Sequence, residues 1–199
     1  MNRMVCMKAV YDKLPTAPVV VTTGYSCREA MALGDRSLNF YMVGSMGLAS
    51  AIATGIALCR PGPTVVLDGD GALLMNPSNA FMASALGCTN LLHIVLDNGS
   101  YESTGGQPTC AEGFDFASFA LSIGYGDAAC VDKLEDFLAV LDGFSARADG
   151  PFLIHAFIAK TAGTRAPRIT LPLNVIGQRF RMALGASQTE QTVHQGRES

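Results

Sequence analysis

Two polar segments that directly follow apolar runs carry the residues best suited to chemistry. Residues 64–67 lead into Asp68-Gly69-Asp70-Gly71-Ala72, and residues 91–96 lead into Asp97-Asn98-Gly99-Ser100. A carboxylate between two glycines can bind a hard cation while a diphosphate approaches the backbone. The second segment adds an amide oxygen, and the separation of Asp70 from Asn98 leaves room for a helix and a return strand. The spacing therefore predicts that both side chains meet at one edge of a parallel sheet.

The surrounding pattern predicts the elements that would position these segments. Short apolar runs that end in turn residues indicate buried strands, and the longer segments between them have helical spacing. Strands that alternate with helices are typical of an α/β fold, here a doubly wound, mostly parallel sheet with helices on both faces. The expected strands are 18–23, 39–43, 64–67, 91–96 and 152–158. One helix is expected to begin after Gly24, and four more are expected over 48–58, 76–86, 114–123 and 131–144.

The length and hydrophobic content fit a single domain. The chain has 199 residues, of which 49% are hydrophobic, enough to fill one sizeable core. Apolar residues recur at helical spacing from Leu173 to Leu184, and a polar stretch follows. We therefore expect one domain over residues 1–184 and a mobile tail over 185–199.

Charge and composition weigh against several classes of protein. The chain carries 14 basic and 17 acidic residues, for a net charge of −3, without a basic cluster, so a nucleic-acid partner is not expected. Apolar runs are too short to cross a membrane, and the N-terminus lacks the apolar core of a signal peptide, so we expect a cytoplasmic protein. Six cysteines without a CxxC pair argue against a zinc site or a redox dithiol.

Three motifs in order resemble those of a known enzyme family. They are Gly69-Asp70-Gly71 with Asn98, then Gly44-Ser45-Met46-Gly47, and the run Glu102-Ser103-Thr104-Gly105-Gly106-Gln107-Pro108-Thr109. Over about residues 18–160 the chain resembles phosphonopyruvate decarboxylase and sulfopyruvate decarboxylase. The likeness is to their diphosphate-binding (PP-type) domain or β subunit. The resemblance implies the thiamine diphosphate-binding fold, with thiamine diphosphate and Mg²⁺ as cofactors.

The resemblance also implies which residues hold these cofactors. Asp70 and Asn98 would bind Mg²⁺ through their side chains, and Ser100 through its backbone carbonyl, since oxygen ligands suit a small, hard cation. The alternative reading of the residues alone is that Asp70 and Asn98 are turn residues at strand ends. The other residues expected to border the cofactor are Thr23, Gly24, Ser26, Gly44, Ser45, Met46, Gly69, Gly71, Ala72 and Tyr101.

Two residues would act in catalysis by this resemblance, and a third is a candidate because of its position after the metal-binding segment. The backbone carbonyl of Gly44 would contact the aminopyrimidine 4′-amino group, and Met46 would bend the cofactor so that it can deprotonate itself. A core methionine is the alternative for Met46. Glu102 could transfer protons or could be a structural carboxylate bonded to loop amides. Residues 105–109 are expected to form a loop that orders over the cofactor.

The resemblance implies a partner. The glutamate that protonates the aminopyrimidine belongs to a separate pyrimidine-binding domain, for which the residues before the first strand leave no room. We therefore expect an α subunit to supply it, in an α₂β₂ or larger hetero-oligomer, and we expect this chain alone to be inactive.

The implied reaction belongs to phosphonate biosynthesis: decarboxylation of phosphonopyruvate to phosphonoacetaldehyde and CO₂. Two alternatives stay open, a sulfopyruvate decarboxylase β subunit that gives sulfoacetaldehyde, and a non-catalytic scaffold or regulatory subunit that binds the cofactor. A Rossmann-type nucleotide binder is disfavoured because Gly-x-Gly-x-x-Gly is absent from the first turn. The distal anion could be bound by the partner or by basic residues of this chain, each of which also has a plain structural reading: Arg28, His93, Lys160, Arg165 and Arg168.

Overall fold

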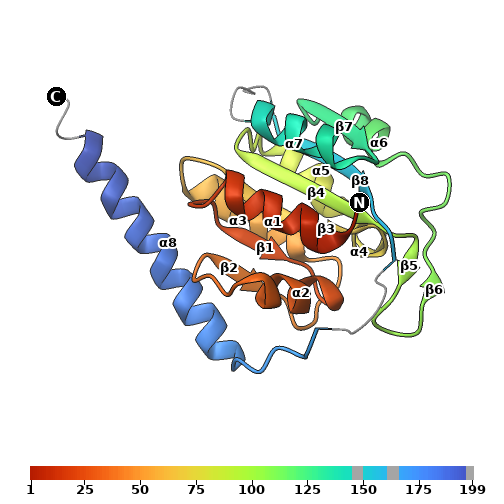
Figure 1. The fold of residues 1–199 in the computed structure, drawn as a ribbon. Coiled ribbons are helices and arrows are strands. Elements are labelled where there is room, and N and C mark those ends of the chain that lie inside the picture. Colours follow the sequence, from red (N-terminus) through yellow and green to blue (C-terminus); the bar gives the residue numbers. More distant parts are fainter. Residues whose placement is uncertain (145–149, 161–165, 196–199) are drawn as a thin grey trace.

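A six-stranded parallel sheet forms the centre of the protein. The computed structural model describes residues 1–144, 150–160 and 166–195 (Figure 1). The strand order is β2-β1-β3-β4-β8-β7, and every neighbouring pair is parallel, which confirms the predicted sheet. The strands are β1 (Val19–Val21), β2 (Asn39–Tyr41), β3 (Thr64–Gly69), β4 (Leu91–Asp97), β7 (Asp127–Val131) and β8 (Phe152–Phe157).

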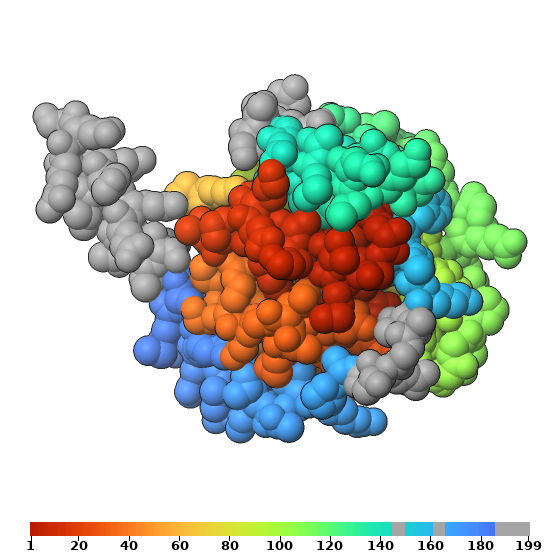
Figure 2. Space-filling view, in the orientation of Figure 1, coloured from red at the N-terminus to blue at the C-terminus, as the bar shows by residue number. Residues whose placement is uncertain are grey.

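Helices cover both faces of the sheet because successive strand residues point to opposite sides. Val19 and Val21 pack in one core with the helices of the first face, whereas Val20 packs in a second core with α3 and α5. The first face carries α1 (Arg3–Lys13), α2 (Tyr25–Leu33) and α7 (Leu134–Gly143), which occupy the middle of the surface seen in Figure 2. The other face carries α3 (Ala49–Cys59), α4 (Asp70–Met75), α5 (Ser78–Ala85) and α6 (Phe116–Ser122).

Several elements differ from the prediction. Helix α1 was not predicted, and β7 precedes the helix expected from residue 131, so α7 begins only at Leu134. Part of the run 102–109 belongs to a hairpin, in which β5 (Ser100–Tyr101) pairs antiparallel with β6 (Gln107–Pro108).

The C-terminal segment also differs in its secondary structure. Helix α8 (Leu173–Gln195) continues ten residues beyond Gly185, where we expected the tail to begin, and runs past the edge of the sheet in Figure 1. Near its start, Phe180 packs on Phe40 of β2, with ring centroids 5.4 Å apart. Residues 196–199 lie outside the described residues, and mobility of the tail stays a prediction.

Among the described residues, no helix combines the length and the apolar character that crossing a bilayer requires.

Candidate functional site

The two predicted metal-binding segments lie side by side at one end of the sheet. Strands β3 and β4 are parallel neighbours with Gly69 opposite Leu96, so Asp70 and Asn98 follow adjacent strand ends. In parallel α/β sheets the carboxyl ends of the strands are where ligands bind. The structure thus brings together the two side chains that the sequence spacing was expected to unite.

Asp70 is a buried carboxylate with few compensating contacts. It is 3% exposed, and its Oδ2 accepts a hydrogen bond from the hydroxyl of Thr109. Burial raises the pKa of Asp70 above its ordinary value, and nearby Asp97 adds to the rise, while hydrogen bonds from Thr109 and from the backbone of Gly71 and Asn98 oppose it. A bound cation would offset the cost of burying this charge.

Asn98 begins a tight turn that lines the same cavity as Asp70. Its Oδ1 accepts from the backbone N–H of Ser100 at 3.0 Å, and Asp97 holds the N–H of Gly99 at 2.9 Å. Gly99 has φ +62°, a conformation that favours glycine. The hydroxyl of Ser100 is buried and has no hydrogen-bond partner among the described residues. The turn therefore offers a side-chain amide oxygen and an unsatisfied hydroxyl beside Asp70.

The second glycine of Gly69-Asp70-Gly71 is required by packing. A Cβ atom at Gly71 would lie 2.3 Å from Cε1 of Tyr101 and 2.9 Å from Cγ2 of Thr109, whereas one at Gly69 would meet nothing within 4 Å. Gly71 thus lets the segment that follows Asn98 close over the start of α4.

The end of β1 supplies the third side of the same cavity. Gly24 has φ +95° and precedes α2, whose first turn has no side-chain cap, so its amides can bind an anion. The buried hydroxyl of Thr22 also has no partner among the described residues. These orphaned donors, together with Asp70, fit a diphosphate held through a divalent cation. Of the predicted cofactor residues, the cavity is lined by Thr23, Gly24, Ser26, Met46, Gly69, Asp70, Gly71, Ala72, Asn98, Ser100 and Tyr101.

The turn after β2 only partly joins this cavity. Met46 lines it, whereas Gly44 and Ser45 line a neighbouring apolar groove of about 680 Å³ with Val43 and Leu48. Ser45 has φ +53°, the only positive φ at a non-glycine residue among the described residues. Met46 is half-buried and lines the cavity that contains Asp70, and its contact with the cofactor stays a prediction.

Glu102 is held by an arginine that the sequence analysis missed. Arg3 of α1 is 7% exposed and binds Glu102 at 2.6 Å and Glu29 of α2 at 3.0 Å. All three side chains are largely buried, so the ion pairs join α1, α2 and the segment after Asn98. Of the two readings left open for Glu102, this arrangement favours a structural carboxylate.

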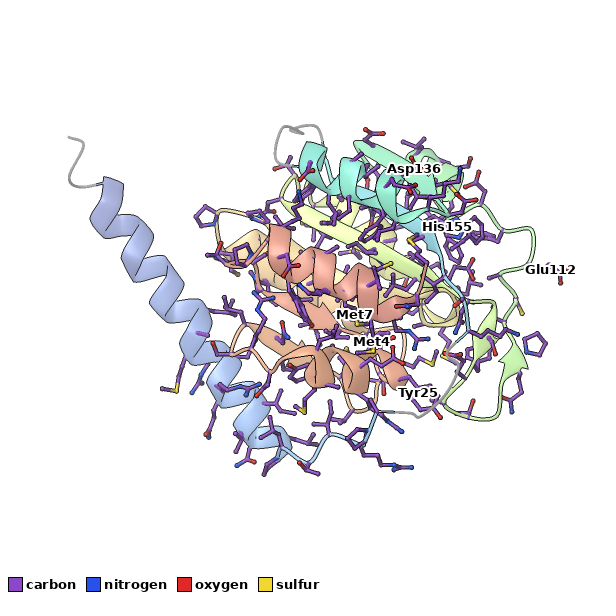
Figure 3. The ribbon with its side chains drawn as sticks, in the orientation of Figure 1. Met4, Met7, Tyr25, Glu112, Asp136 and His155 are labelled. Carbon is purple, nitrogen blue, oxygen red and sulfur yellow. The ribbon has the colours of Figure 1, made fainter. Side chains whose placement is uncertain are left out.

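The predicted anion-binding residues separate into different environments. His93 is fully buried in β4, where Nδ1 lies 3.1 Å from the hydroxyl of Tyr125 and Nε2 lies 3.5 Å from Oδ2 of Asp68. It is a core histidine outside the cavity. Lys160 lines a separate pocket of about 690 Å³ that also contains His155, and Figure 3 shows His155 on β8, away from Tyr25 at the start of α2.

The remaining basic candidates lie closer to the cofactor cavity. Arg28 and Arg168 line a small cavity that shares Thr23, Gly24 and Ser103 with the cofactor cavity. Arg165 lies outside the described residues.

Sequence reasoning missed several residues of the site. Arg3, Thr22 and Ser103 line the cavity, and Thr109 binds Asp70. Thr22 adjoins the predicted Thr23-Gly24 turn, and Ser103 and Thr109 lie in the run 102–109. The sequence motifs therefore indicated where these residues lie, but not which contacts they make. The sequence gives a weaker indication of Arg3 than of these three residues. Asn2 is a helix N-cap, and the apolar Cys6, Met7 and Val10 form a buried stripe that Arg3 extends as a charged residue.

Comparisons with known proteins agree with this geometry. Residues 22–156 match the family model described as thiamine pyrophosphate enzyme, C-terminal TPP binding domain. The chain is 41% identical to a phosphonopyruvate decarboxylase from Streptomyces viridochromogenes, over 90% of this chain and 45% of that protein. It is 39% identical to a sulfopyruvate decarboxylase from Methanosarcina acetivorans, over 92% of this chain and 46% of that protein.

Other matches differ in how much of the relative they cover. The chain spans about half the length of those two relatives. It covers 94% of the sulfopyruvate decarboxylase subunit beta from Methanothermobacter thermautotrophicus, with 35% identity over 90% of this chain. A solved structure from Mycobacterium smegmatis, described as a thiamin diphosphate-dependent enzyme, shares the fold. Its TM-score is 0.68 at 22% identity, over 80% of this chain and 32% of that one. The chain therefore belongs to the thiamine pyrophosphate enzyme family, as its C-terminal TPP-binding domain.

Proposed function

We propose that this chain is the β subunit of a decarboxylase that uses thiamine diphosphate and Mg²⁺ to convert phosphonopyruvate to phosphonoacetaldehyde and CO₂. The observation that carries the proposal is the convergence of Asp70, Asn98 and the Thr23-Gly24 turn on one cavity. The curated relatives, named as decarboxylases of phosphonopyruvate and sulfopyruvate, support a 2-oxo acid as the substrate.

The chain's own residues would bind and orient the cofactor. Asp70 and Asn98 would hold Mg²⁺ with their side-chain oxygens, and Ser100 would add its backbone carbonyl. The uncapped amides at the start of α2 would bind the diphosphate. When bound, the cofactor supplies an electron sink for the carbanion that loss of CO₂ leaves behind. Met46 would fix the angle between its two rings, and the carbonyl of Gly44 would accept a hydrogen bond from its amino group.

A partner would supply the group that protonates the aminopyrimidine. Among the glutamates whose side chains the structure describes, Glu29 and Glu102 bind Arg3, and Glu112 points away from the body of the protein in Figure 3. Glu135 lies exposed at the start of α7. Of these four, only Glu102 lines the cofactor cavity, and its carboxylate is engaged by Arg3. We therefore propose an α chain as the source, as the name subunit beta of the Methanothermobacter relative implies.

Reconstitution tests the proposal directly. The chain would be combined with the product of a neighbouring gene that encodes a pyrimidine-binding domain, and CO₂ release would be measured with Mg²⁺ and thiamine diphosphate. We expect turnover of phosphonopyruvate by the complex and none by this chain alone. Asp70→Ala should abolish turnover and metal-dependent cofactor uptake, because it removes a metal ligand. Asp136→Ala is the matched control, since Asp136 is an exposed carboxylate on α7 (Figure 3).

The same assay separates the alternatives. Faster turnover of sulfopyruvate than of phosphonopyruvate would identify the sulfonate as the substrate. Relatives named for the two substrates are about equally similar to this chain, at 41% and 39% identity. Cofactor uptake without turnover of any 2-oxo acid would show a non-catalytic subunit. Full activity of Asp70→Ala would contradict the assigned metal site.

A further inference from the structure

A second cavity beside the cofactor site contains two arginines and no acidic residue. It has a volume of about 260 Å³ and is lined by Thr23, Gly24, Cys27, Arg28, Val43, Ser103, Arg168 and Ile169. We propose that Arg28 and Arg168 bind the distal phosphonate of the substrate and thereby determine specificity for a 2-oxo acid whose distal group carries two negative charges. This inference rests on the proposed function, since it assigns the substrate's second anionic group within that reaction.

The two arginines are available for a ligand. Neither Arg28 nor Arg168 forms an ion pair with a carboxylate in the described parts of the chain. Arg28 is half-buried, with its guanidinium 5.0 Å from the ring centroid of Tyr25, and Arg168 is exposed. Every other lining residue is neutral. The cavity therefore concentrates positive charge in a chain whose net charge is −3.

The cavity adjoins the place where the cofactor would lie. Thr23, Gly24 and Ser103 line both cavities, and a Cβ atom at Gly24 would lie 3.2 Å from Oγ of Ser103. Val43 belongs to the same wall and directly precedes Gly44. A substrate whose ketone faces the cofactor could thus extend its other end between Arg28 and Arg168.

Size and charge favour a small tetrahedral anion. The volume is below the roughly 300–1,000 Å³ of pockets for drug-sized ligands. Guanidinium groups donate paired N–H bonds to phosphate-like oxygens, and two of them match the two charges of an ionised phosphonate better than the single charge of a sulfonate. The same chemistry could instead bind the terminal phosphate of the cofactor, so the test must separate substrate from cofactor.

The test uses the reconstituted complex with Arg28→Gln, Arg168→Gln and both changes together. Because a hydrogen bond to a charged group is lost, each single variant should lower kcat/KM for phosphonopyruvate by about 10- to 100-fold. Turnover of pyruvate, which lacks the distal anion, should stay unchanged, as should the calorimetric Kd of thiamine diphosphate. Arg181→Gln removes the same charge from an exposed position on α8 and should change none of these values.

A binding measurement keeps the inference independent of turnover. Calorimetry with 3-phosphonopropionate, a saturated analogue of the substrate without the ketone, should show binding to the cofactor-loaded wild-type complex. The affinity should fall about tenfold or more in each variant. Absence of binding to the wild type, an equal loss of kcat/KM for pyruvate, or weaker cofactor binding would each overturn the assignment. If the wild type decarboxylates no 2-oxo acid, the proposed function fails, and the binding experiment still decides whether the arginines form an anion site.

Discussion

Replacing Arg3 by methionine should destabilise the protein more than any exposed charge change. The substitution keeps an unbranched side chain but removes the cation that binds Glu29 at 3.0 Å and Glu102 at 2.6 Å. Both carboxylates are largely buried, with side-chain exposures of 5% and 11%. Removing one partner of a buried ion pair costs about 3–5 kcal/mol, because the remaining charge stays desolvated.

The effect is large enough to measure by thermal and urea unfolding. For a chain of this size a loss of about 3–5 kcal/mol lowers the Tm by roughly 6–20 °C. Lys8→Met is the matched control in the same helix, since the Lys8–Asp12 pair is exposed and contributes about 0–1 kcal/mol. Arg3→Lys, which keeps the charge but not the forked geometry, should give an intermediate loss.

A second substitution tests the cause of the loss. If uncompensated charge is responsible, Glu29→Gln added to Arg3→Met should recover part of the stability, since it removes one of the two carboxylates. A loss below about 1 kcal/mol for Arg3→Met, or no recovery in the double variant, would refute the reasoning.

Three further changes have defined outcomes. Gly71→Ala would place a methyl group 2.3 Å from the ring of Tyr101, so we expect a loss of about 1–3 kcal/mol in unfolding free energy; an unchanged urea midpoint would contradict this. Asp70→Asn removes a charge whose pKa is raised by burial, so the Tm of the metal-free protein should rise at neutral pH while calorimetric cofactor uptake is lost; a lower Tm would argue against it. Arg179→Gln removes the hydrogen bond that holds the pKa of Asp35 below its ordinary 3.8; this stabilisation is present above that value and lost as the pH falls through the folded pKa. The variant should therefore be less stable by under about 1 kcal/mol at neutral pH and equal to wild type in acid, and a difference independent of pH would speak against the pair.

The sheet was predictable because its central strands are continuous buried runs. Every residue of β4 is buried, so the run from Leu91 needs no alternation to be recognised. Strand β7 lies at the sheet edge and is mostly half-exposed. Its mixed sequence, Asp-Ala-Ala-Cys-Val, shows neither the alternation of a half-buried strand nor the spacing of an amphipathic helix. Helix α1 escaped prediction because Arg3 occupies the first position of its buried stripe, where the pattern predicts an apolar residue.

The site shows the same division between local and tertiary information. Asp70 and Asn98 follow successive strand ends, so their meeting could be inferred from the order of elements, whereas the Thr23-Gly24 turn was assigned to the cofactor through the family resemblance. The contacts of Arg3 with Glu29 and Glu102 join residues far apart in the sequence. No local pattern encodes such pairs, because a buried arginine and a solvated one have the same sequence signature. The pairing of Arg28 with Arg168 across one cavity is likewise tertiary information.

Helix α2 connects these tertiary contacts to one another. Successive helix residues point roughly 100° apart, so Arg28 can face the cavity that it shares with Arg168 while Glu29 binds Arg3, which lines the cofactor cavity. The first turn of the same helix borders the predicted diphosphate position. A change at Arg3 should therefore shift the part of α2 that borders both cavities, and should weaken the binding of cofactor and of substrate. A change at Arg28 removes one charge from a helix that stays in place, so it should alter substrate preference alone.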